Sequence, residues 1–294
     1  MSGFRLTRRA SLALGAASSF GPSSAYAQKL DLDDPKAAGR IRAKIMGSAA
    51  EEAVHTFMRL HFYAYRHDGN LIPLYTMNNL NVRRWSPQPD GGFKAKVFEC
   101  GVYSKFDTTE PIEFWENPFS GEKIKTWPLL SGPLNLAIAA DGNVTTGAEA
   151  TVKPQPQNFE VIGDNVFMPQ ASAFSLPHPF PAQEWPKENS GERSFRDSHY
   201  VYIAKAADVA NAALSNVPSV VQLQNLVSWA YWLRMGQIPG RTWGRGFGAK
   251  LTSLDALPRW VRVDMEKKTP KIFDTAHWTE FVNEVAEYKA SHRP

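Results

Sequence analysis

Apolar and polar side chains alternate between residues 54 and 65. One set of alternate positions holds Val54, Thr56, Met58, Leu60, Phe62 and Ala64, and the other holds His55, Phe57, Arg59, His61, Tyr63 and Tyr65. A period of two is typical of a β-strand whose two faces meet different environments. The chain is therefore expected to form a strand here.

Turn residues at regular intervals predict that this strand belongs to a longer antiparallel meander. Asp68-Gly69-Asn70 is typical of a hairpin, and further turns are expected at 87–92, 107–111 and 117–121. Extended segments are expected at 71–85, 93–106, 112–115, 122–127, 134–139, 159–175 and 194–204. So many strand edges favour a curled sheet or a barrel-like closure.

Helical signals flank this β-rich region. Asp34 can cap a short, peripheral helix that begins at Pro35, and another short helix is expected over 208–214. Near the C-terminus, Asp274 or Thr275 can cap a final helix that docks on the sheet. The face expected to dock holds Trp278, Phe281, Val282 and Val285. The predicted fold class is α+β, mainly antiparallel β, with peripheral N- and C-terminal helices on a curled sheet or barrel-like meander.

Three segments give weaker signals. Residues 176–193 are rich in proline and are expected to be irregular, either as a connection between sheet edges or as a lid over a pocket. Residues 219–235 are rich in aromatic side chains and fit more than one kind of element. Glycines recur between residues 236 and 248, which predicts a loop, but their spacing matches no phosphate-binding motif. We therefore expect no nucleotide and no other cofactor.

The first 27 residues have the order of an export signal. Thr7-Arg8-Arg9-Ala10-Ser11-Leu12 is followed by a mildly apolar stretch and by Ala25-Tyr26-Ala27, which fits a signal-peptidase site. The segment resembles twin-arginine signals, although Ser11 stands where these usually have an apolar residue. We expect cleavage after Ala27, a periplasmic or secreted location, and the export machinery as a partner. An amphipathic helix or a disordered tail is the alternative.

This interpretation divides the chain into three parts. Residues 1–27 would be the signal peptide, residues 28–53 an N-terminal segment with a short helix, and residues 54–294 a single β-rich domain with a C-terminal helix. No run of apolar residues after the signal is long enough for a membrane-spanning helix. The oligomeric state stays open, a homo-oligomer included.

Charge argues against a nucleic-acid partner. The whole chain has 33 basic and 29 acidic residues, a net charge of +4. Arg5, Arg8 and Arg9 lie in the signal segment, so 30 basic residues face 29 acidic ones in the rest. A nucleic-acid-binding surface needs a larger cationic surplus.

The sequence contains no strong metal or nucleophile motif. The seven histidines include no pair at helical ligand spacing, and His55 and His61 are about 20 Å apart along an extended strand. We therefore expect no metal site, although ligands from separate strands stay open. The lone Cys100 lies inside an expected strand, where inert packing is the usual role, and no GxSxG motif is present.

Acid–base chemistry is the remaining option. Arg59, His61 and Tyr63 share one strand face, and Asp197 shares a face with His199. If these faces look into a closed sheet, His61, Tyr63 and His199 could move protons while Arg59 and Asp197 bind the ligand. A solvated sheet face is the alternative. The aromatic cluster gives further binding candidates, Trp229, Trp232 and the neighbouring Arg234, although such rings equally suit an ordinary core.

Several short motifs resemble those of the family known as domain of unknown function 1838, which occurs in bacteria and fungi. They are Asn117-Pro118-Phe119-Ser120-Gly121-Glu122, Gly132-Pro133-Leu134-Asn135, Trp232-Leu233-Arg234-Met235-Gly236, Gly240, Lys250-Leu251, Leu257-Pro258 and Pro270. The resemblance covers residues 50–275 and implies a single domain, and it adds Asn135 as a binding candidate. The family offers no activity to carry over. It often has Trp where this chain has Arg234, so the ligand could differ.

Two functions stay open on these grounds. One is an exported protein that binds a small aromatic or apolar molecule in a barrel pocket and transforms it by cofactor-independent lyase, isomerase or hydrolase chemistry. The other is a non-catalytic periplasmic binding or interaction protein. The sequence alone decides neither the ligand nor whether the protein is an enzyme.

Overall fold

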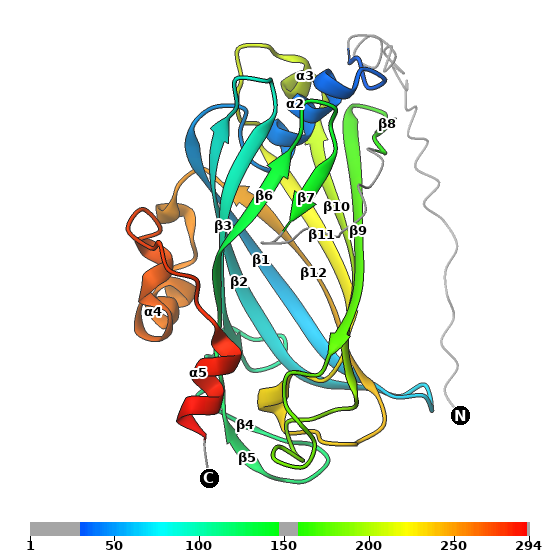
Figure 1. Cartoon of the computed structure of the whole chain (residues 1–294), viewed down its shortest axis with the longest axis vertical. Helices are drawn as coiled ribbons and strands as arrows, with labels where there is room; N and C mark the ends of the chain where they lie inside the picture. The colour runs from blue at the N-terminus through cyan, green and yellow to red at the C-terminus, as the bar shows by residue number, and fades with distance from the viewer. Residues whose placement is uncertain (1–29, 147–157, 293–294) are drawn as a thin grey trace, which may run out of the picture.

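A computed structural model describes residues 30–146 and 158–292. Its main feature is an antiparallel sheet of ten strands that curls into a half-barrel (Figure 1). The strands of this sheet are β1 (Glu52–Tyr65), β2 (Leu71–Pro87), β3 (Phe93–Ser104), β6 (Leu129–Ile138), β7 (Val144–Thr146), β8 (Glu160–Ile162), β9 (Asn165–Pro177), β10 (Arg193–Lys205), β11 (Ser219–Val227) and β12 (Arg241–Leu251). A separate pair, β4 (Phe114–Glu116) and β5 (Lys123–Lys125), lies at one end of the half-barrel.

Short helices complete the described part of the chain. They are α2 (Pro35–Met46), α3 (Ala206–Ala210), α4 (Arg259–Lys268) and α5 (Glu284–Ser291), with 3-10 turns η1 (Tyr231–Leu233), η2 (Leu254–Ala256) and η3 (Pro270–Phe273). None of the helices within residues 30–146 and 158–292 has the length and apolar character needed to cross a membrane. The predicted class, mainly antiparallel β with helices near the ends, is confirmed.

The sheet is built from two meanders that β12 joins. The strand order is β7-β6-β3-β2-β1-β12-β11-β10-β9-β8, so β12 pairs with β11 on one side and with β1 on the other. Hairpins at two of the predicted turns connect β1 to β2 and β2 to β3; the first is closed by a bond from the Arg66 N–H to the Asn70 carbonyl. The last strand of the chain thereby becomes a central strand of the sheet.

The prediction of a glycine-rich loop over 236–248 is wrong for most of that segment, because β12 occupies it. Gly244, Gly246 and Gly248 face the interior opposite large β1 side chains such as Leu60. A Cβ on Gly246 would lie 2.0 Å from the carbonyl oxygen of Arg59, closer than any contact allows. The glycines therefore let β1 and β12 approach each other closely, as the tight curl requires.

Helix α2 closes one end of the half-barrel (Figure 1). As predicted, it begins at Pro35, and the Asp34 side chain accepts a bond from the Ala37 N–H. It is less peripheral than expected, because eight of its twelve residues are buried. Its C-terminal carbonyls accept bonds from inward-facing strand residues: Arg83 Nη1 binds Met46 O, and Lys250 Nζ binds the carbonyls at 44 and 47. Cations suit the negative end of a helix dipole.

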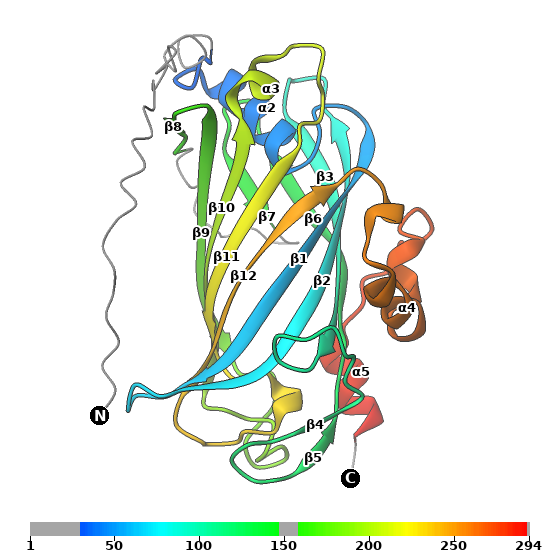
Figure 2. The same ribbon diagram turned by 180° about the vertical axis from the view of Figure 1, so that it is seen from behind.

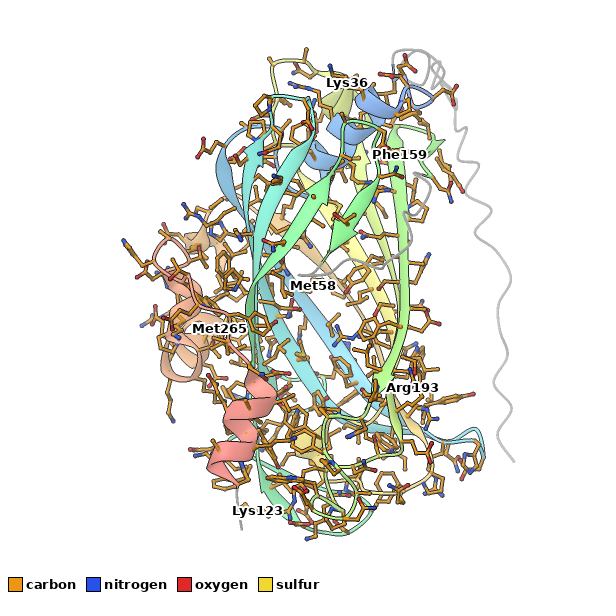
Figure 3. All side chains as sticks on the ribbon, viewed as in Figure 1. Lys36, Met58, Lys123, Phe159, Arg193 and Met265 are labelled. Carbon is orange, nitrogen blue, oxygen red and sulfur yellow. The ribbon has the colours of Figure 1, made fainter. Side chains whose placement is uncertain are left out.

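A second apolar layer lies on the outside of β2 and β3. Leu80 and Cys100 point outward there and pack under α4, whose Met265 is fully buried. Figure 3 shows the two layers, with Met58 inside the half-barrel and Met265 on the outer side. In Figure 2, α4 covers this part of the sheet, and no helix covers the outer faces of β11 and β12.

The predicted final helix is wrong in its position. Residues 274–283 form turns and an isolated bridge between Val282 and Gly132, and α5 begins only at Glu284, with Asn283 as its cap. Of the expected docking face, Trp278 and Val282 pack on the outer apolar layer, whereas Phe281 is exposed and Val285 packs against the inner core. The segment lies along the outside of the sheet and brings α5 to its edge (Figure 1).

Candidate functional site

The half-barrel contains a cavity of about 290 Å³ between its inner wall and α5. Inward-facing strand residues form most of the wall, and the segments around η1 and α5 complete it. Its lining includes Met58, Leu60, Phe62, Tyr75, Met77, Glu99, Tyr103, Trp127, Leu129, Phe174, His178, Arg196, Tyr200, Leu223, Asn225, Trp229, Tyr231, Trp232, Thr242 and Glu284. This volume is at the lower end of the range typical of small-molecule sites.

The β1 face expected to line the cavity points outward instead. Arg59 donates from Nη2 to the Thr108 carbonyl at 2.7 Å, and His61 Nε2 lies 3.0 Å from Asp107 Oδ1. Tyr63 accepts a bond from Arg245 Nη2 at 3.3 Å, also on the outer face. The apolar face with Leu60 looks inward, because the interior of the half-barrel holds the main hydrophobic core. The prediction that the polar face looks into a hollow is wrong.

Strand β10 shows the same reversal. Asp197 and His199 are exposed on its outer face, whereas Arg196 and Tyr200 line the cavity. The alternation of a strand fixes which residues share a face, but it leaves open which face is the inner one. The prediction that Asp197 and His199 share one strand face was therefore right, and the prediction that this face looks inward was wrong.

The remaining predicted site residues are divided between the cavity and the surface. Trp229 and Trp232 line the cavity. Asn135 is exposed and accepts a bond from Lys96 Nζ at 2.7 Å, away from the cavity. Arg234 lies outside the cavity lining and forms ion pairs with Glu122 and Glu188.

Interlocking aromatic rings from β2, β3 and η1 form part of the cavity wall. The ring centroids of Tyr103 and Trp232 are 4.8 Å apart, those of Tyr75 and Tyr103 are 5.0 Å apart, and those of Tyr75 and Trp232 are 5.4 Å apart. Such tilted and edge-on pairs stabilise one another beyond simple burial. Burial raises the pKa of both tyrosine hydroxyls, so they stay neutral in the physiological range. The result is a rigid wall with phenol groups that can donate hydrogen bonds.

Two carboxyl groups face this aromatic wall, and sequence reasoning missed both. Glu99 projects inward from β3 and accepts a bond from Asn79 Nδ2 at 2.8 Å. Glu284, the first residue of α5, enters the cavity from the open side of the sheet. Burial raises the pKa of Glu284 to about 7. A carboxyl group with that pKa can both accept and donate a proton at neutral pH.

Charges around Glu284 modify this effect of burial. A backbone hydrogen bond from Leu130 lowers the pKa, the negative Glu99 raises it, Arg196 lowers it and Glu287 raises it, in this order of size. Glu99 thus influences Glu284 more strongly than Arg196 does. Two carboxyl groups that repel each other in one cavity favour a state with a single negative charge.

The proline-rich segment adds His178 to the wall. Phe180 N–H donates to His178 Nδ1 at 3.2 Å, and Ser190 lies near the other ring nitrogen. Burial lowers the pKa of His178, so the ring is neutral at physiological pH. The loop holds the His178 side chain in place. The loop is therefore part of the cavity wall as well as a connection between β9 and β10.

Two polar side chains of the cavity lack partners. Within residues 30–146 and 158–292, Thr242 Oγ1 and Asn225 Oδ1 are buried and form no hydrogen bond. They lie on neighbouring strands, β12 and β11, and both face the cavity. Buried polar atoms are normally satisfied, so these two are exceptions within the wall, and Asn225 Oδ1 packs against Gly244 of β12.

Metal-binding geometry is absent from the part of the chain that the structure describes. No three His, Cys, Asp or Glu side chains come together there in a way that could hold an ion. The chemistry on view is that of carboxyl, phenol and guanidinium groups.

A sequence signal existed for Glu99 but not for Glu284. Glu99 is the single charge in an otherwise apolar run, Val97 to Tyr103, and a lone carboxylate in a buried strand is a candidate for function. Glu284 follows an irregular segment whose path depends on tertiary packing. Nothing in its local pattern distinguishes it from Glu287, which is exposed.

Two of the motifs that resemble those of the family meet outside the cavity. Asn117 is fully buried, and its Nδ2 donates to the Leu233 carbonyl at 3.1 Å. In the same two segments, Glu122 pairs with Arg234. The Asn-Pro-Phe-Ser-Gly-Glu turn therefore fixes the segment that carries Trp232, and its role is to position the cavity wall.

The fold and site define a curled antiparallel half-barrel whose cavity combines aromatic walls with two carboxyl groups. Residues 59–287 match the family described as Protein of unknown function (DUF1838), and the chain belongs to this family. No curated protein matches the chain.

Proposed function

We propose that the protein binds a small, largely aromatic or apolar molecule in this cavity and transforms it by proton transfer without a cofactor. Glu284 carries the proposal, because a carboxyl group with a pKa of about 7 lies in an aromatic cavity large enough for a small ligand. Perturbed carboxyl groups in clefts are the usual mark of acid–base sites. Lyase, isomerase or hydrolase reactions are the matching classes.

The proposed step is the removal of a proton from the ligand. Ionised Glu284 takes the proton from a C–H or O–H acid held against the rings of Tyr103 and Trp232. The negative charge that develops on the ligand accepts a hydrogen bond from Tyr200, whose pKa burial raises to about 12 and which therefore stays protonated. Returning the proton to another atom of the ligand gives an isomerisation, and loss of a leaving group gives an elimination.

Elimination of 5-nitrobenzisoxazole tests this step, because it needs only a base in an apolar site. The base removes the ring C–H proton, the N–O bond breaks, and the coloured 2-cyano-4-nitrophenolate forms. We expect the protein to accelerate the reaction, with a rate that rises as pH passes through about 7. We expect Glu284→Gln to lose about 100-fold or more of this rate.

Glu287→Gln is the matched control, because it makes the same change on the exposed side of the same helix. His61→Ala is a second control, because His61 lies on the outer face. Both should keep the rate within about twofold. A Glu284→Gln variant as fast as the parent protein, or a parent protein no faster than acetate at the same concentration, would exclude the proposed base.

A non-catalytic binding protein is the second candidate. The interlocked rings around Trp232 support it, since they form a binding wall that has no chemistry of its own. Quenching of intrinsic tryptophan fluorescence by 2-ethylnaphthalene, without turnover of any C–H acid, is the outcome that favours this candidate.

We also propose that the protein is exported to the periplasm or secreted. The support is the Arg8-Arg9 pattern and the small residues up to Ala27, a segment that lies outside the described residues. Fractionation of a bacterial host tests the proposal. The parent chain should be found outside the cytoplasm, and a variant with Arg8→Lys and Arg9→Lys should stay inside it; equal distributions would exclude this route.

A further inference from the structure

We infer that the molecule bound in the cavity is an organic cation, a protonated amine on an aromatic or apolar body. The inference rests on the proposed binding function and specifies the class of ligand. It follows from two independent features of the wall: an excess of negative charge and a high density of aromatic rings.

The first feature is an uncompensated pair of carboxyl groups. Among the described residues, no Lys, Arg or His lies within ion-pair distance of Glu99 or Glu284. Arg196 is exposed, and its guanidinium lies 5.9 Å from the ring of Phe174 on β9. One guanidinium cannot neutralise two carboxylates, so a bound cation is what would let both carboxyl groups of the cavity stay ionised.

The second feature is the ring wall itself. Tyr75, Tyr103, Trp229 and Trp232 all line the same cavity as the two carboxyl groups. The negative face of an aromatic ring attracts a cation, by up to about 2 kcal/mol when the site is desolvated. The same rings provide apolar contact for the body of the ligand, so both halves of an arylalkyl amine find suitable surroundings.

These features also rank the alternatives. A carboxylate ligand would be repelled by two carboxyl groups, and only Arg196 and the phenol hydroxyls would favour it. A neutral alcohol would leave the repulsion between Glu99 and Glu284 unchanged. A protonated amine relieves this repulsion.

Four naphthalene probes of nearly equal shape provide the test: 2-(aminomethyl)naphthalene, 2-naphthylmethanol, 2-ethylnaphthalene and 2-naphthoate. Binding to the mature chain is measured by calorimetry or tryptophan fluorescence at pH 8, where the amine is charged. We expect the amine to bind about tenfold more tightly than the alcohol or the hydrocarbon, which corresponds to the attraction of a desolvated cation by rings and carboxylates. The naphthoate should bind most weakly.

Charge-neutral variants identify the source of the preference. Glu284→Gln and Glu99→Gln should each reduce the advantage of the amine over the alcohol to about twofold or less, whereas Glu287→Gln should keep it. Circular dichroism shows whether each variant is folded. If only one of Glu284→Gln and Glu99→Gln folds, that variant alone is enough for the test. Binding of the hydrocarbon as tight as that of the amine would overturn the inference and leave the proposed function standing. Failure of all four probes to bind would instead remove the proposed function.

Discussion

The amide of Asn79 on β2 holds the carboxylate of Glu99 on β3, with 2.8 Å between Nδ2 and Oε1. The same Nδ2 donates to the Cys100 carbonyl at 3.1 Å. Both partners are acceptors, so the amide has only one orientation that satisfies them. Asn79 is fully buried, and the position of Glu99 inside the half-barrel is thereby fixed by the sheet and not by solvent. The negative charge that acts on Glu284 has a defined origin.

Stability should depend on pH through Glu284. Its pKa is about 7 in the folded protein and near 4.5 in the unfolded chain, so between these values the folded state holds a proton that the unfolded state has lost. The free energy of unfolding therefore falls as pH rises from about 4.5 to 7. Glu284→Gln should remove this loss and be more stable than the parent protein at pH 8 by about 1–3 kcal/mol, with little difference at pH 4.5.

Urea unfolding at a series of pH values measures this effect, with Glu287→Gln as the control because that residue is exposed. Parallel pH profiles for the parent protein and Glu284→Gln would contradict it. Other charged or titratable residues interact electrostatically with Glu284 and contribute to the same pH profile. They are Glu99, Arg196, Glu287, Tyr103 and Tyr231.

Gly246→Ala should destabilise the sheet. The new Cβ would lie 2.0 Å from the Arg59 carbonyl oxygen and 2.8 Å from Leu60 Cα, and backbone cannot move aside as a side chain can. We expect a loss of about 1–3 kcal/mol or more in the free energy of unfolding. The neighbouring Phe247→Ala is the control, since Phe247 is 65% exposed on the outer face and should change stability by less than about 0.5 kcal/mol. Equal effects of the two changes would show that β1 and β12 are not in close contact.

Arg234→Ala should act on stability and not on ligand preference. The change leaves Glu188, which is 7% exposed, without its cation, although the Tyr288 hydroxyl still donates to it at 3.3 Å. Because the Arg234 side chain is 32% exposed, we expect a loss of about 1–3 kcal/mol, less than for a fully buried pair, and a partial recovery when Glu188→Gln is added. Unfolding of the single and double variants measures both. An unchanged midpoint for Arg234→Ala would show that the pair adds nothing.

Cys100 should be unreactive in the folded protein. It is completely buried under α4, and burial raises the pKa of its thiol to about 12, so almost no thiolate exists at pH 8. Labelling by iodoacetamide should be at least about 100-fold slower in buffer than in 6–8 M urea. Val261→Asp, which places a charge in the buried face of α4, should speed labelling, and fast labelling of the parent protein would mean that α4 does not cover this strand.

Much of the sheet was accessible from sequence because hairpin turns and two-residue alternation are local signals. Strands β1, β2, β3, β9 and β10 lie close to their predicted ranges, and Asp34 and Pro35 mark the start of α2 as expected. The segment around Gly246 was misjudged, since glycines in a strand are typical of loops unless the neighbouring backbone is known. The C-terminal helix was misplaced because the face of Trp278 and Val282 is apolar without being helical.

The site was harder to predict than the fold. Alternation grouped Arg59 with His61 correctly, but the choice of inner face requires knowing that the half-barrel is filled by a core. Here the apolar face of β1 is the inner one, as burial would favour, and the polar face lies against the 106–108 loop. Glu284 could not be found in this way, because its position depends on the path of ten residues with no regular structure before it.

Glu284 belongs to a helix that forms after the last strand and takes no part in the sheet. Under the proposed function, substitution at this one position changes the reactivity of the molecule while all ten strands keep their packing. Members of the family that share the half-barrel need not share a reaction. The residue at the position of Glu284, where α5 begins, is the criterion by which to divide them into subgroups.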